Sequence, residues 1–403
     1  MKRLFYFFVF LALQAPLSAR NPYHAKVTVD IFSEKFSAST FLNLTEELTT
    51  KNIGHDIPNY TPNTPASIAL NLRGLEATIA FQANSTTLVF TMPQTGLTET
   101  FTGATRDQSL ALFRDFISNN KDGLRRLHKA QRKFTPIDPV AGNPNSLLAL
   151  MPQADYLLGR LTPLSGCDCC WSAQPVHYLF QTGFLDTEAM CRGFNTTNYS
   201  FPLRYSFSPD HRWAFILDMP LNVIVDGRAF CLDTSLGLGV RMPVTPNWSL
   251  TPILRTGVNV SIDLSTGGSF ISTGVTSCYD FHIRNWVLSV IDYAGYITSL
   301  PLHAGGINFD YHLHNFVFKN GLALTSCQGW QVCGRPVNLS LTYENSAFTG
   351  STLFIEHFNE VGLALITQHI IPCLCYDLLS LNVSYQFGHR SYKAYTIGLI
   401  YQF

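Results

Sequence analysis

The sequence predicts an all-β transmembrane barrel that follows a small α/β domain. Charged residues make up only 13% of the 403 residues, about half of the roughly 25% that is usual in soluble domains. Aromatic residues also make up 13%. The C-terminal part alternates large apolar residues with small or polar ones at a period of two. A barrel with an apolar lipid-facing side and a polar lumen accounts for all three observations.

The charge balance and the motifs exclude several classes of function. The 27 Lys and Arg residues balance 27 Asp and Glu residues, so we expect no nucleic-acid partner, which would need a concentrated basic surface. The sequence contains no P-loop, no dinucleotide fingerprint and no nucleophile elbow. We therefore expect no enzyme activity and no cofactor. His312 and His314 could share one face of a strand, but such a pair more often marks a polar turn, and we expect no metal site.

The amino end has the pattern of a secretory signal peptide, which we place at residues 1–19. A basic start, Met1 to Arg3, precedes the apolar run from Leu4 to Leu13 and small residues up to Ala19.

An exported chain permits disulfides. Metal binding would favour paired C-x-x-C motifs or a helical histidine spacing, which are absent. We expect disulfides within loop-like segments, with free or intermolecular thiols as the alternative and with a pairing that the sequence leaves open. The candidates are Cys167, Cys169, Cys170, Cys191, Cys327, Cys333, Cys373 and Cys375.

We place the predicted α/β domain at residues 20–140. Five short strand-like runs, 27–31, 67–72, 77–81, 87–91 and 97–101, fit a small antiparallel sheet.

A helix follows the last of these runs. Thr105 and Gln108 form a capping box at its start, and Asp122 with Gly123 is expected to interrupt it. The basic segment from Lys121 to Lys133 fits a solvated helix face, or a contact with anionic lipid head groups, cell-wall polymer or an acidic barrel lumen.

Residues 141–170 are predicted to form a helical segment that links the α/β domain to the barrel or plugs the barrel lumen. Asn145 or Ser146 can cap a helix over residues 143–160, and Pro152 is expected to kink it. Two positions remain open for this helix: inside the barrel lumen, or packed in the periplasm.

We place the predicted barrel at residues 171–403, as 12 to 14 antiparallel strands in an up-and-down order. Runs such as 230–241, 248–263, 379–387 and 394–403 alternate at a period of two. Closure into a barrel leaves no strand edge in lipid. The polar positions of these runs are our candidates for the lumen lining: Asp233, Arg241, Arg255, Asn259, Asp263, Asn382 and Gln386.

The carboxyl end carries a family resemblance over roughly residues 170–403. The export signal, the aromatic alternation and the terminal Phe403, with Tyr401 and Leu399 on the same face, resemble Gram-negative outer-membrane β-barrel proteins. The resemblance implies an outer-membrane location, contact with outer-membrane lipid, and a last strand that is read by the barrel-assembly machinery. Residues 101–107 and 138–147 are similar to stretches of uncharacterised autotransporter-like barrel proteins.

Three functions fit these features. The first is a narrow passive channel or a structural and anchoring barrel with a periplasmic N-terminal domain; in its channel form, charged lumen residues would bias ion passage. The second is an autotransporter-like barrel with residues 20–140 as a short exported passenger. The third is a secreted, disulfide-bonded binding protein without a membrane. If Phe403 lies at the periplasmic rim, the cysteine loop 327–333 should lie outside and the pair at 373–375 near the periplasm.

Overall fold

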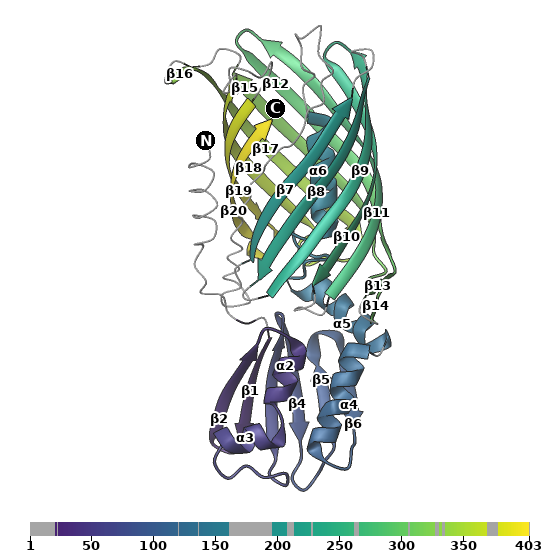
Figure 1. The fold of residues 1–403 in the computed structure, drawn as a ribbon, viewed down its shortest axis with the longest axis vertical. Helices are drawn as coiled ribbons and strands as arrows, with labels where there is room; N and C mark the ends of the chain where they lie inside the picture. The colour runs from purple at the N-terminus through teal and green to yellow at the C-terminus, as the bar shows by residue number, and fades with distance from the viewer. Residues whose placement is uncertain are drawn as a thin grey trace.

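The computed structural model describes residues 21–402 except 22, 120, 136, 161–195, 208–212, 227–228, 262–265, 305–306, 327–329, 333–334 and 369–377. The chain forms an N-terminal α/β domain and a β-barrel that lie end to end (Figure 1).

The N-terminal domain is built on a six-stranded antiparallel sheet with the order β2-β1-β3-β4-β5-β6. Buried residues alternate along its strands, as in β4, so one face of the sheet carries the core and the other faces solvent. The strands are β1 (Tyr23–Val29), β2 (Phe32–Ala38), β3 (Ala66–Leu72), β4 (Leu75–Phe81), β5 (Leu88–Met92) and β6 (Leu97–Phe101).

Helices cover the buried face of this sheet (Figure 1). The Phe113 ring is fully buried and packs against the rings of Phe41, Phe90 and Phe101. This aromatic contact joins two of the helices to the sheet. The helices are α2 (Phe41–Glu47), α3 (Thr50–Asp56), the single turn η1 (Pro93–Thr95), α4 (Arg106–Asn119) and α5 (Lys121–Phe134).

The predicted helix start is confirmed. The backbone N–H of Gln108 donates to Thr105 Oγ1 at 3.2 Å, and the Gln108 side chain accepts from Ala104 N at 2.9 Å. The predicted interruption of the helix lies slightly earlier than expected: α4 ends at Asn119 and α5 begins at Lys121, so Asp122 and Gly123 lie in the first turn of α5. Gly123 instead permits a close approach of α5 to α4: a Cβ there would lie 2.6 Å from the carbonyl oxygen of Phe116.

The barrel confirms the predicted fold class. Every strand pairing in it is antiparallel, and a 12-stranded sheet joins sequence neighbours along a path of eleven strands from β7 to β20, with β16 paired to β17. Among the described residues, eleven strands form the continuous path, and the twelfth, β16, is a three-residue strand off it. The strands are β7 (Thr196–Phe207), β8 (Ala214–Asp226), β9 (Ala229–Thr245), β10 (Trp248–Ser261), β11 (Thr266–Ile283), β12 (Trp286–Leu300), β15 (His314–Ser326), β16 (Trp330–Val332), β17 (Arg335–Gly350), β18 (His357–Gln368), β19 (Leu378–Gly388) and β20 (Lys393–Gln402).

Short elements complete the connections between barrel strands. A small hairpin of β13 (Leu302–Ala304) and β14 (Ile307–Phe309) lies between β12 and β15. The turn η2 (His389–Ser391) joins β19 to β20, where the sequence predicts a tight connection.

The barrel wall is apolar outside and polar inside. Along β9, Leu232, Leu236 and Leu238 are exposed, whereas Asp233 and Ser235 between them are buried. This arrangement is the reverse of a soluble sandwich and matches the lipid-facing surface of a membrane barrel. No helix in the described part of the chain is both long enough and apolar enough to cross a membrane.

The last strand ends at the mouth opposite the N-terminal domain. Backbone hydrogen bonds from Phe354 N to Arg132 O and from Ile355 N to Gly142 O, at 2.7 and 2.9 Å, fix the mouth that faces the domain. Strand β20 begins at that mouth and ends at Gln402, which pairs with Leu378 at the other mouth (Figure 1).

The strand pairing also overturns the expected separation of two cysteine groups. Gln368 and Leu378, which flank residues 369–377, pair with each other, and Thr367 pairs with Val337 of the strand that follows residues 333–334. The chain therefore enters and leaves both cysteine segments at the same mouth.

Candidate functional site

The candidate site is the barrel lumen, and a helix of the same chain occupies it. Helix α6 (Leu147–Arg160) lies inside the barrel (Figure 1) and contacts β9, β10, β11 and β12. Where it approaches the wall, the wall carries small residues. A Cβ at Gly257 would lie 2.8 Å from the sulfur of Met151, and a Cβ at Gly321 would collide with the Tyr156 hydroxyl.

A buried ion-pair network joins this helix to the wall. The Arg255 guanidinium donates from Nε to Asp155 Oδ1 of α6 at 2.6 Å, and from Nη2 to Asp218 Oδ2 of β8 at 2.7 Å. Its Nη1 donates to Ser235 Oγ at 2.9 Å, and Arg204 adds a second cation to Asp218 at 3.0 Å. Two arginines thus balance two aspartates in a region with almost no solvent access.

Asp155 makes further contacts that fix the rotation of α6. Its backbone carbonyl accepts from Thr276 Oγ1 at 3.0 Å, and its second carboxylate oxygen accepts from the Tyr293 hydroxyl at 3.4 Å. Removing one partner of a buried ion pair typically costs about 3–5 kcal/mol, because the other charge is left without compensation. The network therefore resists displacement of the helix.

The other side of α6 contacts a second polar group on the wall. Gln153 Nε2 donates to Glu344 Oε2 of β17 at 3.3 Å. The Lys319 ammonium lies 5.3 Å from the centre of the Tyr156 ring and donates to Ser346 Oγ at 2.6 Å. The helix is thus held from both sides of the lumen.

Four of the seven predicted lumen residues are buried. Arg255 contacts the helix directly. Asn259 and Asp233 lie near the domain-facing mouth, where Asn259 donates to Pro139 O at 3.3 Å and Asp233 accepts from Asn222 at 3.1 Å. Gln386 is buried, donating to Glu360 Oε2 at 2.8 Å and accepting from the Tyr392 hydroxyl at 2.7 Å.

The other three predicted lumen residues either contact only nearby residues or lie outside the described part of the chain. Arg241 is half-buried and donates to Ser249 Oγ at 3.3 Å. Asn382 is half-buried and accepts from Ser380 Oγ at 2.9 Å. Asp263 lies outside the described residues.

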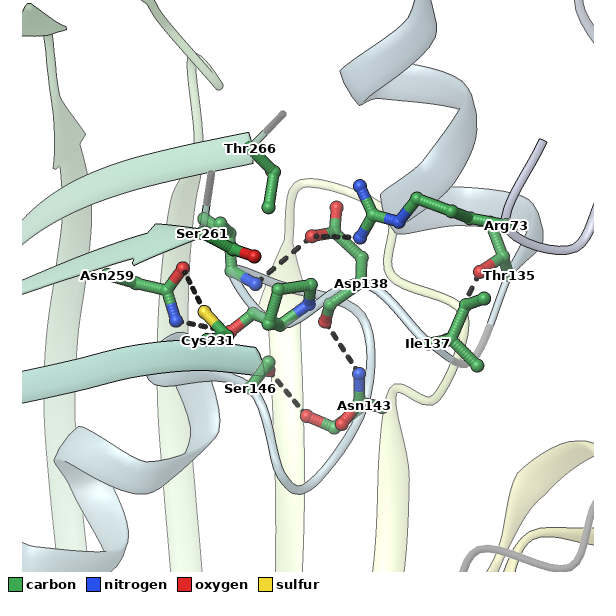
Figure 2. Close-up of polar contacts among 12 residues, drawn as sticks. Arg73, Thr135, Ile137, Asp138, Asn143, Ser146, Cys231, Asn259, Ser261 and Thr266 are labelled. Carbon is green, nitrogen blue, oxygen red and sulfur yellow. Dashed lines mark hydrogen bonds and ion pairs between the residues drawn. The ribbon is translucent and has the colours of Figure 1, made fainter. Parts of the chain in front are cut away.

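A second buried cluster lies at the domain-facing mouth, and Figure 2 shows Arg73 and Asp138 within it. Arg73 projects from the tip of the β3–β4 hairpin, and its Nη2 lies 3.6 Å from Asp138 Oδ1. The Tyr311 hydroxyl donates to the Asp138 carboxylate at 3.2 Å, and the ring of His128 stacks on the Tyr311 ring at 4.7 Å.

Burial is the largest cause of the pKa shifts of Asp138 and His128 in this cluster. It raises the pKa of the Asp138 carboxyl, while the positive charge of Arg73 acts in the opposite direction. Burial, assisted by the charge of Arg73, lowers the pKa of His128 to about 3, so His128 is neutral at physiological pH.

The basic segment takes part in this closure. His128, Gln131 and Arg132 are buried against the junction, whereas Arg126 is exposed and lies 3.8 Å from Glu99 on the domain surface. The interaction with cell-wall polymer stays a prediction, and it would involve the exposed part of α5.

The other predicted residues lie mostly outside the described part of the chain. All eight predicted disulfide cysteines, residues 1–19 and Phe403 are among them. Two further cysteines are buried in the wall: the Cys231 thiol donates to Asn259 Oδ1 at 3.1 Å, and the Cys278 thiol donates to Asp280 Oδ1 at 3.8 Å. Leu399 and Tyr401 lie in β20. His312 pairs with Asp310 at 2.8 Å, and the described residues contain no group of three or more metal-ligating side chains.

Sequence reasoning missed the residues that connect helix, domain and wall: Arg73, Asp138, Asp155 and Asp218. Asp155 offered one signal, because it is the only acidic residue in α6, a largely apolar helix. Arg73 directly precedes Gly74 in a hairpin turn, but a turn position alone does not distinguish a solvated arginine from a buried one.

Comparison with protein-family models and with curated proteins finds no match. Among solved structures, the β domain of the Bordetella autotransporter BrkA is similar with 11% identity and a TM-score of 0.42, covering 57% of this chain and 98% of that one. The translocator domain of the autotransporter NalP from Neisseria meningitidis has 12% identity and a TM-score of 0.40, with coverages of 63% and 97%. The NanC porin has 12% identity and a TM-score of 0.37, with coverages of 57% and 100%.

Proposed function

We propose that this protein is an outer-membrane barrel that is closed by its own helix α6 and that anchors the N-terminal domain at the membrane. The observation that supports it best is the buried contact between Asp155 of α6 and Arg255 of the wall. A helix held by compensated buried charges is a stable filling of the lumen, because leaving would expose or isolate those charges.

Because helix α6 fills the lumen as a plug, an anchoring role fits this barrel better than an open channel does. Side chains alone fill the interior of a barrel of about eight strands, and the diameter grows with strand number, so this barrel has room for a helix. Here Leu147, Met151 and Leu158 of the helix are buried inside it. Solute passage would require α6 to move, so conduction in the resting protein should be very low.

The side of the membrane that holds the N-terminal domain is the second part of the proposal. A periplasmic location of the domain would fit a barrel that anchors cell-envelope components. The strand order supports a location on the cell surface instead, because β20 ends at the mouth opposite the domain. If the carboxyl end is periplasmic, as in the barrel proteins that the sequence resembles, the domain lies on the cell surface, as in an autotransporter-like protein. We favour this surface location.

Conductance of the purified full-length protein in a planar bilayer tests the plug. We expect almost no current from the wild type and frequent openings from Arg255→Met, which removes the partner of Asp155. Arg241→Met is the matched control, because Arg241 lies on the next strand and bonds to Ser249, not to α6. Stable large currents from the wild type would contradict a closed barrel.

Protease access on intact cells tests the sidedness. Surface exposure predicts cleavage within residues 21–119 without permeabilising the outer membrane. Cleavage only after permeabilisation would place the domain in the periplasm, and recovery of the protein in a soluble fraction would contradict the barrel proposal. Contacts with outer-membrane lipid and with the barrel-assembly machinery belong to the same proposal.

A further inference from the structure

The β3–β4 hairpin of the N-terminal domain inserts a charged side chain into the junction with the barrel. Arg73 at its tip is among the largest fully buried side chains of the protein, and it has a positive φ of 56° beside Gly74. An arginine carries a large desolvation cost when buried, so its placement needs a compensating partner. Asp138, which is also fully buried, is the acidic group paired with it.

Asp138 belongs to the segment that leads directly into the plug helix. Its side chain accepts from Val140 N at 3.0 Å, and its backbone carbonyl accepts from Asn143 Nδ2 at 2.7 Å. The first residues of α6 fold back onto the same segment, because Leu147 N donates to Pro139 O and Leu148 N to Val140 O, at 2.9 and 3.1 Å. The position of Asp138 therefore determines where α6 begins.

The same segment is also fixed to the barrel rim. Asn259 of β10 donates to Pro139 O at 3.3 Å, and Tyr311 of the β14–β15 connection donates to Asp138. Gly142 has a φ of 106°, and a Cβ there would lie 2.6 Å from the Arg132 carbonyl oxygen. The segment is thus a compact connector between the domain, the rim and the plug (Figure 2).

We infer that Arg73 is a positioning residue of a latch, in which the N-terminal domain holds the plug helix in the lumen through the Arg73–Asp138 ion pair. The inference rests on the proposed function, since it presupposes that α6 closes the barrel. It adds that closure depends on the docked domain. Withdrawal of the hairpin leaves Asp138 buried without Arg73, and the connector that carries it loosens together with the start of α6.

The test uses Arg73→Met and Asp138→Asn in the full-length protein, with heat-modifiable gel mobility to confirm that each variant forms a barrel. We expect each single variant to raise the open probability in planar bilayers at least about tenfold, a change equivalent to about 1.4 kcal/mol. Cleavage within residues 137–146 by a broad-specificity protease should increase in parallel. In the double variant, the change in the free energy of opening should be smaller than the sum of the changes in the two single variants, because the two sites interact directly.

Arg126→Met is the matched control. It removes an ion pair of the same domain, with Glu99, in which both side chains are exposed. Unchanged conductance and protection in this control are expected. If Arg73→Met stays closed and protected while Arg255→Met conducts, the latch is wrong although the plug is right. If neither variant conducts, neither ion pair is needed to hold α6 in the lumen, and the latch is contradicted.

Discussion

The carboxylate of Asp155 on helix α6 lies 2.6 Å from the guanidinium of Arg255 on strand β10, and neither side chain is accessible to solvent. The two residues are 100 positions apart in the sequence. This contact joins helix α6 to the barrel wall and holds it in the lumen. The predictions below follow from it and from the junction at the barrel mouth.

Replacing Asp155 with Leu should destabilise the barrel, because Arg255 and Arg204 then share the single carboxylate of Asp218. We expect a loss of about 3–5 kcal/mol, the usual cost of breaking a buried ion pair by removing one partner. The temperature at which heat-modified mobility appears measures the loss. The double variant Asp155→Leu with Arg255→Met should recover much of it. A double variant that is as unstable as both single losses added together would refute a direct interaction.

Replacing Gly321 with Val should displace the plug. The added side chain would occupy the position of the Tyr156 hydroxyl, and a displaced tyrosine would lose its contact with Lys319. We expect an increased open probability in bilayers. Leu322→Val is the control, because Leu322 is the next residue on β15 and is exposed on the outer face. Equal conductance of the two variants would show that Gly321 does not accommodate the plug.

Acidification should weaken the junction through His128. Its pKa is lowered to about 3 by burial and by the charge of Arg73, against about 6.5 in an unfolded chain. Between these values the unfolded state binds a proton that the folded state does not, so His128 contributes stability at neutral pH that is lost as the pH falls below about 6.5. Asp138 acts in the opposite sense, because burial raises its pKa.

His128→Phe isolates the histidine contribution and keeps a ring beside Tyr311. Relative to the wild type, this variant should gain about 2–3 kcal/mol between pH 7 and pH 4.5, a slope of about 1.4 kcal/mol per pH unit. Thermal unfolding of the junction at both pH values measures the gain. His55→Gln changes an exposed histidine of α3 and should show no comparable gain. A pH-independent difference between His128→Phe and the wild type would contradict a buried neutral histidine.

Replacing Phe113 with Ala should unfold the N-terminal domain before the barrel. The ring is fully buried among three other aromatic rings, and such truncations cost about 3–5 kcal/mol. Protease digestion should then remove the domain and leave a heat-modifiable barrel fragment. Leu112→Ala, at a largely exposed position next in the same helix, should leave the domain resistant. Loss of the barrel together with the domain would show that the two parts do not fold independently.

The barrel could be predicted because its determinants are local. The alternation that indicates β9, β10, β19 and β20 is a property of consecutive residues, and the structure confirms it. Strand β2 carries no such alternation, because it is an edge strand with mostly exposed residues. Helix α2 carries a local signal at its start, where Thr40 Oγ1 accepts from Asn43 N.

The site could be predicted only in part, because its contacts are not local. Arg255 is a candidate from its place on the polar face of β10, but its partners Asp155 and Asp218 come from a helix and another strand. The sequence left two positions open for the helix around residues 143–160, since its periodicity fits either one. Only the tertiary arrangement shows that small residues such as Gly257 leave room for it in the lumen.

The position of α6 is the central claim, and photo-crosslinking tests it most directly. A photoreactive benzoylphenylalanine in place of Tyr156, in the full-length protein assembled in outer membranes, should crosslink to the barrel wall. Peptide mapping should find the adduct in β15 near Lys319 and Gly321, since both residues contact Tyr156. Adducts confined to the N-terminal domain, or to proteins of the periplasm, would show that the helix lies outside the lumen.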